Sequence, residues 1–209
     1  MPKKQPQSEA DRVKKHFDKD TAVHSMEVIK DDGEFRHLKF SRNGSSVYQF
    51  CLTTWPGYLC ISGDMGDFVF SRLRDMFTFF RGDHGINPHY WAEKVKAGVT
   101  HEWSQELFER NVKEHVMCQF YDSFLKCRKA MRSVKENIFD HNDGEWESVE
   151  AIHSWNDPDK TGLQFDDFWE YDCKDYTYCY LWCCYAIVWG IQRYDLYKGV
   201  AQAEAVIAE

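Results

Sequence analysis

Apolar and polar residues alternate along residues 22–70, and this alternation gives way to a helical spacing further along the chain. Leu38 and Phe40, for example, alternate with charged neighbours, a period of two that is typical of a strand with one buried face. Turn-forming pairs such as Asp32-Gly33 separate the apolar runs. The pattern predicts an antiparallel meander with strands at residues 23–30, 35–41, 47–53, 58–62 and 68–70.

After residue 71 the apolar residues fall three and four positions apart, which is the spacing of an amphipathic helix. Ser8 is a suitable N-cap for an earlier short helix, with Asp11 completing a variant of the capping box. Gly98 and Gly144 mark helix boundaries. The predicted helices are residues 8–17, 73–80, 90–97, 102–139 with one break, a segment after Gly144, and 173–194, with 201–209 as a frayed end.

Strands that come first and helices that follow predict an α+β fold, in which an N-terminal antiparallel β-meander packs with a mainly helical C-terminal half. A chain of 209 residues with 43% hydrophobic residues can bury a sizeable core. We expect residues 1–7 to be a disordered basic tail and residues 8–209 to form a single domain. That domain is expected to be β-rich over 20–70 and helical over 71–209.

The longest apolar stretch, residues 176–191, is rich in Tyr, Cys and Trp. It is shorter than the roughly 20 residues that span a bilayer. A buried core helix is therefore favoured over a membrane-embedded segment, and we expect Leu181, Ile187, Val188 and Trp189 to be buried. The N-terminus shows no apolar signal segment, so we expect reduced thiols and a cytoplasmic location. Cys179, Cys183 and Cys184 then serve as small apolar residues, with a zinc site as the alternative.

The segment 136–175 is acidic and aromatic at once, with 13 Asp and Glu residues against two Lys and Arg. A disordered acidic tail has few aromatic residues, so this segment is expected to fold and to present its carboxylates on a shaped surface. Such a surface suits a basic protein partner and repels nucleic acid, in agreement with a pI near 5.6. Its aromatic residues are Phe139, Trp146, Trp155, Phe165, Phe168, Trp169 and Tyr171.

Basic residues concentrate just before this segment. Residues 71–135 carry 12 Lys and Arg against eight Asp and Glu. Pairing of these cations with the acidic segment is the favoured interpretation, and a small anion-binding stripe is the alternative.

Three short motifs have a chemical alternative to a structural role. Residues 157–162 begin like an EF-hand loop, but Phe168 stands where a closing Glu is needed, so an Asx-turn loop is favoured over a calcium site. Residues 63–67 predict a hairpin turn with a glycine at positive φ, or else a polar site that uses Asp64. His84 and His89 share a loop with Asp83, yet their loose spacing makes a metal site improbable, and we expect no cofactor and no bound metal. Motifs of nucleophilic, redox or phosphate-binding catalysis are absent from the sequence, so an enzyme is the less favoured class.

Two stretches carry a resemblance to a known family. The run TWPG…GDMG…VFSRL.DMF.FFR lies within residues 45–81, and LW..YAIVWGI lies within residues 178–195. In these runs the chain resembles a family of short, uncharacterised accessory proteins encoded by prophages and temperate phages of Gram-negative bacteria. The resemblance implies a bacterial cytoplasm and a phage accessory role, which for small proteins of this kind is often the disarming of a host defence by binding, as anti-CRISPR proteins do.

Two hypotheses of function follow. In the first, the acidic aromatic surface binds a host defence protein or nucleoprotein complex and blocks it, without catalysis, direct contact with nucleic acid or a membrane, and with homo-oligomerisation left open. The expected contacts are Asp140, Asp143, Glu145, Glu147, Asp157, Asp159, Asp166 and Asp167. In the second, the chain sequesters or converts a nucleotide-type small molecule. The expected ligand-binding residues are then Trp55, Tyr58, Asp64, His89 and Trp91.

Overall fold

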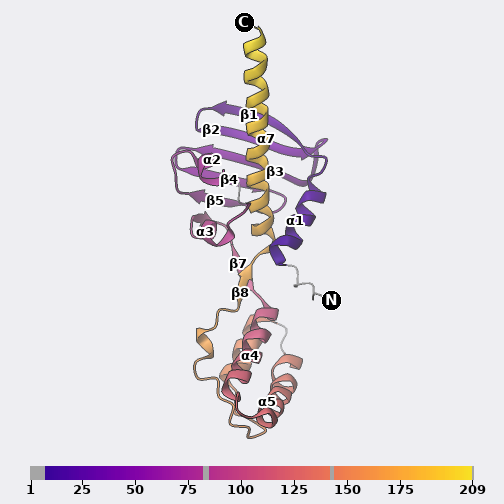
Figure 1. Cartoon of the computed structure of the whole chain (residues 1–209), viewed down its shortest axis with the longest axis vertical. Helices are drawn as coiled ribbons and strands as arrows, with labels where there is room; N and C mark the ends of the chain where they lie inside the picture. Colours follow the sequence, from indigo (N-terminus) through magenta and orange to yellow (C-terminus); the bar gives the residue numbers. More distant parts are fainter. Residues whose placement is uncertain (1–7, 82–84, 142–143, 209) are drawn as a thin grey trace. The chain divides into compact units, whose positions relative to one another are not determined.

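The computed structural model describes residues 8–81, 85–141 and 144–208. The tail predicted at residues 1–7 lies outside these ranges. Within them the chain has the predicted α+β architecture, with an antiparallel sheet first and mostly helices afterwards (Figure 1).

The sheet has six strands in the order of the sequence, each antiparallel to its neighbours. The five predicted strands are confirmed with small shifts of their ends. The strands are β1 (Ser25–Asp32), β2 (Phe35–Arg42), β3 (Ser45–Trp55), β4 (Tyr58–Gly63), β5 (Phe68–Ser71) and β6 (Val95–Ala97).

The predicted alternation places one set of side chains in the core. Leu38 and Phe40 of β2 are fully buried, and so are Leu52 of β3 and Ile61 of β4, while the residues between them are partly exposed. Because side chains of a strand point alternately to opposite faces, these apolar positions form one continuous inner face. This face is covered by α7 (Tyr178–Ala208) and, beside it, α1 (Glu9–Asp20) (Figure 1).

The helix predicted over residues 90–97 is partly wrong. Asn87 caps α3 (Pro88–Ala92), a short helix that begins at a proline, and the chain then extends as β6 along the edge of β5. There Val95 pairs with Phe70, and Ala97 pairs with Val69. The free edge of β5 supplies hydrogen bonds that no local spacing reveals, so a tertiary contact outweighed the helical pattern. The preceding helix, α2 (Met76–Phe80), is capped by Asp75.

The final helix is longer than predicted, because α7 runs to Ala208 and is preceded by β8 (Lys174–Tyr176). Leu181 and Ile187 are buried as expected, whereas Val188 and Trp189 are only partly buried. Cys183 and Cys184 are buried thiols, and burial raises their pKa, so both behave as small apolar residues, while Cys179 is exposed. Nowhere in the described chain does a helix combine the length and the apolar character that crossing a membrane requires.

A glycine sets how closely α7 approaches the sheet. A Cβ atom on Gly190 would lie 2.7 Å from Cδ1 of Leu52 and 3.0 Å from Cζ of Phe40, and both of those side chains are fully buried. Trp189, the residue before Gly190 on α7, packs on Phe40 with ring centroids 5.6 Å apart. Helix and sheet therefore interlock at this point, with the small residue facing the bulky ones.

An ion-pair network joins the sheet to the helices at its edge. The guanidinium of Arg36, a buried residue, donates two hydrogen bonds to Asp75, at 2.9 and 3.0 Å. Tyr194 of α7 donates to Asp31 at 2.7 Å. Partial burial raises the pKa of each carboxyl, but the hydrogen bonds from these partners outweigh it and hold the pKa of Asp31 and Asp75 below its usual range.

Residues 101–175 form a second compact unit with its own hydrophobic core. The long helical pattern is broken once, as predicted, at residues 120–123, where Ser123 caps the next helix. The elements of this unit are β7 (His101–Trp103), α4 (Gln105–Gln119), α5 (Phe124–Asn137), the 3-10 turn η1 (Phe139–His141), α6 (Glu145–His153) and the 3-10 turn η2 (Phe168–Glu170), and β7 pairs with β8.

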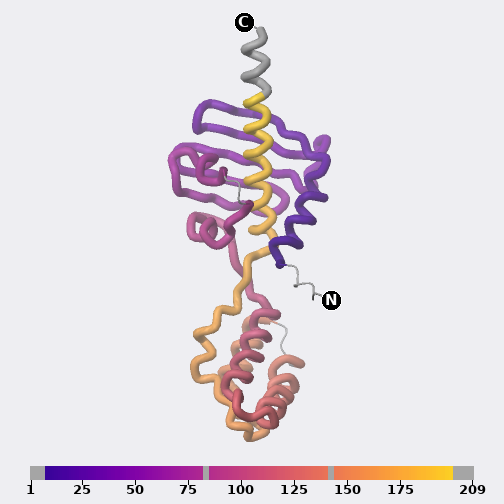
Figure 2. Tube along the Cα trace, viewed as in Figure 1, coloured from indigo at the N-terminus to yellow at the C-terminus, as the bar shows by residue number. Residues whose placement is uncertain are grey.

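The sequence analysis treated residues 8–209 as one domain, whereas the structure divides the chain into two units. Unit 1 comprises Met1–Thr100 and Tyr176–Glu209, and unit 2 comprises His101–Asp175. The division follows two separate clusters of buried side chains, one built on the sheet and α7 and the other on α4, α5 and the acidic segment. Figure 2 traces the chain out of unit 1, through unit 2 and back into α7, so unit 2 is an insertion.

Burial of α7 predicts that Ile187→Asp prevents folding of unit 1. The side chain of Ile187 is fully buried, so the variant loses its apolar contacts and buries an unpaired carboxyl, at a cost of roughly 4 kcal/mol or more. Circular dichroism and thermal melting measure the effect. Leu196→Asp is the matched control, because Leu196 lies on the same helix and is 65% exposed. A normally melting Ile187→Asp protein would refute the core assignment.

Candidate functional site

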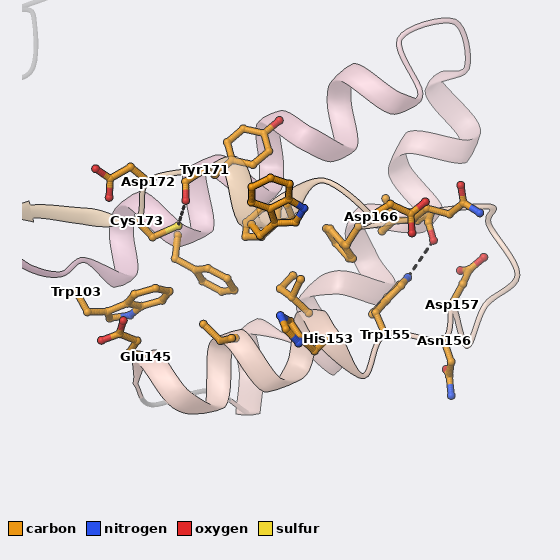
Figure 3. A pocket seen from close by; sticks show the side chains of 18 of the residues that line it. Trp103, Glu145, His153, Trp155, Asn156, Asp157, Asp166, Tyr171, Asp172 and Cys173 are labelled. Carbon is orange, nitrogen blue, oxygen red and sulfur yellow. Dashed lines mark hydrogen bonds between the residues drawn. The ribbon is translucent and has the colours of Figure 1, made fainter.

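Unit 2 has a pocket of about 870 Å³ between α6 and the segment of residues 155–174. We call it the acidic pocket. In Figure 3, Trp103 and Glu145 lie at one end of it and Asn156 and Asp157 at the other. The acidic segment identified in the sequence thus folds around a concave surface.

The floor of the acidic pocket is apolar and rigidly packed. Trp155 donates from Nε1 to the carbonyl of Leu163 at 3.1 Å, and its ring meets Phe165 edge-on, with centroids 5.6 Å apart. Phe165 in turn packs on Phe168 at 5.6 Å. Buried aromatic contacts of this kind hold the floor in one arrangement. The buried residues among those that line the pocket are Phe108, Ile152, Leu163, Phe165, Phe168 and Cys173.

The rim of the acidic pocket combines exposed rings with carboxylates. Trp169 is 75% exposed, an unusual position for the largest apolar side chain, and Tyr171 is partly exposed beside it. Four carboxylates, those of Glu145, Asp157, Asp166 and Asp172, line the pocket with them. Lys174 pairs with Glu145 at 3.6 Å, an exposed and therefore weak ion pair.

Asp157 has a structural task within its loop. Its carboxylate accepts hydrogen bonds from the hydroxyl of Thr161 at 2.8 Å and from the N–H of Gly162 at 2.6 Å. Burial raises the pKa of Asp157, yet the hydrogen bonds from Thr161 and Gly162 outweigh it and lower the pKa overall. These bonds reach residues four and five positions further on, whereas an Asx turn, which the sequence favoured, bonds the backbone two positions on.

Within the described residues, no three side chains of His, Cys, Asp or Glu gather closely enough to hold a metal ion. Asp83 and His84, which the sequence grouped with His89, lie outside the described residues.

The structure brings together part of the predicted partner-binding set. Glu145, Asp157 and Asp166 line the acidic pocket, whereas Glu147, Asp159 and Asp167 belong to the same segment without lining it. Asp140 pairs with Lys135 at 2.9 Å and lines a different groove. Asp143 lies outside the described residues.

Some of the basic residues contact the acidic segment, as the sequence favoured. Lys135 pairs with Asp140, and Lys129 donates to the backbone carbonyl of Asp159 at 2.6 Å. Both lysines belong to α5, so this helix neutralises part of the acidic segment from within unit 2.

Sequence reasoning missed several residues of the pocket. Trp103 and Phe108 precede the acidic segment by about thirty positions and carry no local signal of a shared surface. Trp169 and Tyr171 belong to the acidic aromatic surface of the first hypothesis, but the expected contacts included carboxylates alone.

The residues of the small-molecule hypothesis occupy separate places in unit 1. Trp55 and Tyr58 stack on one another at the β3–β4 turn, with centroids 5.3 Å apart and planes 14° apart. Trp91 is 6% exposed and packs edge-on against Phe80. His89 has its Nδ1 atom 3.5 Å from the hydroxyl of Tyr176. These side chains have local partners and do not line the acidic pocket.

Asp64 belongs to the other end of the β3–β4 pair, where Phe50 faces Gly63. Its carboxylate accepts from the N–H of Tyr48 at 2.8 Å, and its own N–H donates to the carbonyl of Gln49 at 2.9 Å. Tyr48 has a φ of 56°, so Asp64 supports a residue in the left-handed region. Gly66 has a φ of 100°, which confirms the expected glycine of positive φ in this turn.

Comparison of the chain with protein-family models, with curated proteins and with solved structures found no match.

The turn predicts different outcomes for two neighbouring substitutions. Gly63→Ala places a Cβ atom 2.7 Å from Cα of Phe50, against backbone that cannot yield, so we expect a loss of more than about 1 kcal/mol of stability. Asp64→Asn keeps an oxygen that accepts from Tyr48, so we expect its stability to change by less than roughly 0.5 kcal/mol. Urea denaturation measures both. An Asp64→Asn protein that melts normally but loses the protein's biological effect would show that the charge of Asp64 matters, contrary to this structural role.

Proposed function

We propose that the chain is a non-catalytic binding protein whose acidic pocket holds a basic segment of a protein partner. The observation that carries the proposal is the combination of an exposed tryptophan, Trp169, with carboxylates on the rim of a pocket that has an aromatic floor. The pocket volume of about 870 Å³ is enough for several side chains of an extended segment.

The chemistry of the rim favours lysine and arginine side chains. A cation placed over the face of Trp169 or Tyr171 gains a cation–π interaction, which is strongest with tryptophan. The carboxylates of Asp166 and Asp172 add Coulomb attraction, and they attract the partner before contact is made. The methylene groups of the same basic side chain can pack on the apolar floor.

The same charges disfavour a nucleic acid as the direct ligand. Residues 136–175 carry 13 acidic residues against two basic ones, and the whole chain has a net charge of -8. Phosphate groups would be repelled by this field, whereas a basic protein surface would be attracted.

The biological setting is a part of the proposal that rests on the resemblance to prophage accessory proteins. In that setting the partner is a host defence protein or the protein part of a nucleoprotein complex, and binding blocks its action. Proteins that handle nucleic acid carry basic surfaces, and these fit an acidic aromatic pocket.

Two pairs of matched variants test the pocket with a short Arg- and Lys-rich peptide as the probe. Trp169→Ala is expected to weaken binding by roughly tenfold or more, because it removes a central aromatic anchor. Trp146→Ala is its control, since Trp146 is 76% exposed on the same acidic segment but does not line the pocket. Asp166→Asn is expected to weaken binding about two- to fivefold, and Asp167→Asn much less, because Asp166 lines the pocket and Asp167 does not.

Isothermal titration at low and at physiological salt measures these affinities. Binding that does not depend on salt, or equal losses for both members of each pair, would contradict the proposed pocket. In bacteria, the plating efficiency of a phage that the host defence restricts should rise when the native chain is expressed. It should fall back with Trp169→Ala and remain high with Trp146→Ala.

A further inference from the structure

Unit 2 has a second concave surface, a groove of about 710 Å³ along α4 and α5. Each helix contributes one stripe of residues. On α4 the stripe is Glu109, Lys113 and Met117, spaced four apart, and on α5 it passes from Phe124 to Lys135. Residues at this spacing lie on one face of a helix, so the groove follows both helices along their length.

The centre of the groove is apolar and open to solvent. Met117 is 51% exposed and Phe124 is 78% exposed, and the partly buried Met131 and Cys127 pack against the core of unit 2. Methionine side chains are flexible and adapt to the shape of different apolar partners. Exposed apolar residues that line one groove are typical of a binding surface.

The charge around this groove is opposite to that of the acidic pocket. Helix α5 carries five basic residues and one acidic residue, and Arg128, Arg132 and Lys135 line the groove. Lys113 pairs with Glu109 at 2.8 Å and Lys135 with Asp140 at 2.9 Å, but both pairs are exposed and contribute little. The groove lining therefore has more basic than acidic groups, with four against two.

We propose that this groove receives an amphipathic helix of a partner protein, with apolar side chains on one face and carboxylates beside them. A groove between two helices accepts a third helix through anchors spaced three and four residues apart. The apolar side chains of the partner pack on Met117, Phe124 and Met131. Its carboxylates meet Arg128 and Arg132, which can bind them with two parallel hydrogen bonds each.

The test uses the full chain and a fluorescein-labelled acidic amphipathic peptide of about 15 residues, long enough to form a helix in the groove. A second peptide has the same apolar residues with Lys in place of each Glu. Fluorescence anisotropy should show binding of the acidic peptide, weakened by salt, and at least roughly tenfold weaker binding of the basic one.

Two matched pairs of variants separate the groove from general attraction. Phe124→Ala is expected to weaken binding of the acidic peptide roughly fivefold to tenfold, and Leu125→Ala less than about twofold. Both side chains are 78% exposed and adjacent, but only Phe124 lines the groove. Arg128→Glu is expected to weaken binding by roughly tenfold, and Lys126→Glu by less than about threefold, although the change of charge is identical. All four positions are exposed, so thermal melts should show that the variants fold.

Three results would overturn the proposal. One is equal binding of the acidic and basic peptides, and another is equal loss in both members of each pair. The third is displacement of the acidic peptide by single-stranded DNA or by added unlabelled chain, where that displacement is lost in the Phe124→Ala and Arg128→Glu variants. That result would show that the groove takes a nucleic acid or a second copy of the chain instead.

Discussion

The packing of α7 across the sheet is the constraint on which the rest of the structure depends. The strands of residues 25–71 leave one apolar face, and a helix from the far end of the sequence covers it together with α1. Gly190 allows this helix to approach Leu52 and Phe40 closely enough for their side chains to interlock. Since α7 must return to the sheet, unit 1 closes on itself where the N–H of Thr177 donates to the carbonyl of Thr100 at 2.9 Å.

This closure explains how the chain can carry an insertion with a different character. The two ends of residues 101–175 are held close together by unit 1, so the insertion can form a hydrophobic core of its own. Helices α4 and α5 supply part of this core, and the acidic segment supplies another part through residues such as Phe165 and Phe168. Aromatic side chains thus fold a segment whose charge alone would leave it disordered.

Much of the architecture could be predicted from periodicity, and the rest depended on contacts between distant residues. The alternation of Leu38 and Phe40 with charged neighbours identified the meander, and one break in the long helical pattern was expected, although not its position at Ser123. The strand at Val95 was not expected, because its formation depends on hydrogen bonds to the edge of β5. The division into two units could not be predicted from the sequence either, because it depends on which buried side chains contact one another.

The candidate site, too, could be predicted from the sequence only in part. The acidic, aromatic composition of residues 136–175 pointed to a shaped surface, and Glu145 and Asp166 do line a pocket. Composition does not reveal that the carboxylate of Asp157 accepts hydrogen bonds from Thr161 and Gly162, or that Asp140 pairs with Lys135. Those assignments come from geometry.

The two concave surfaces of unit 2 have opposite charge, and both combine charge with exposed apolar side chains. Trp169 is the exposed anchor of the acidic pocket, and Phe124 that of the groove. Charge selects and attracts a partner, while apolar burial supplies most of the affinity. In unit 1, Trp55, Tyr58 and Trp91 take part in ring packing, and Asp64 takes part in a turn.

The most direct test of this account removes residues 101–175 and joins Thr100 to Tyr176 with a short Gly-Ser linker. Because Thr100 and Thr177 are hydrogen-bonded in the native chain, the account predicts a protein that still unfolds cooperatively on heating. It also predicts that titration calorimetry detects no binding of the Arg- and Lys-rich peptide to this protein. Retained binding, or failure of unit 1 to fold, would contradict the claim that the insertion is an independent unit that carries the binding surfaces.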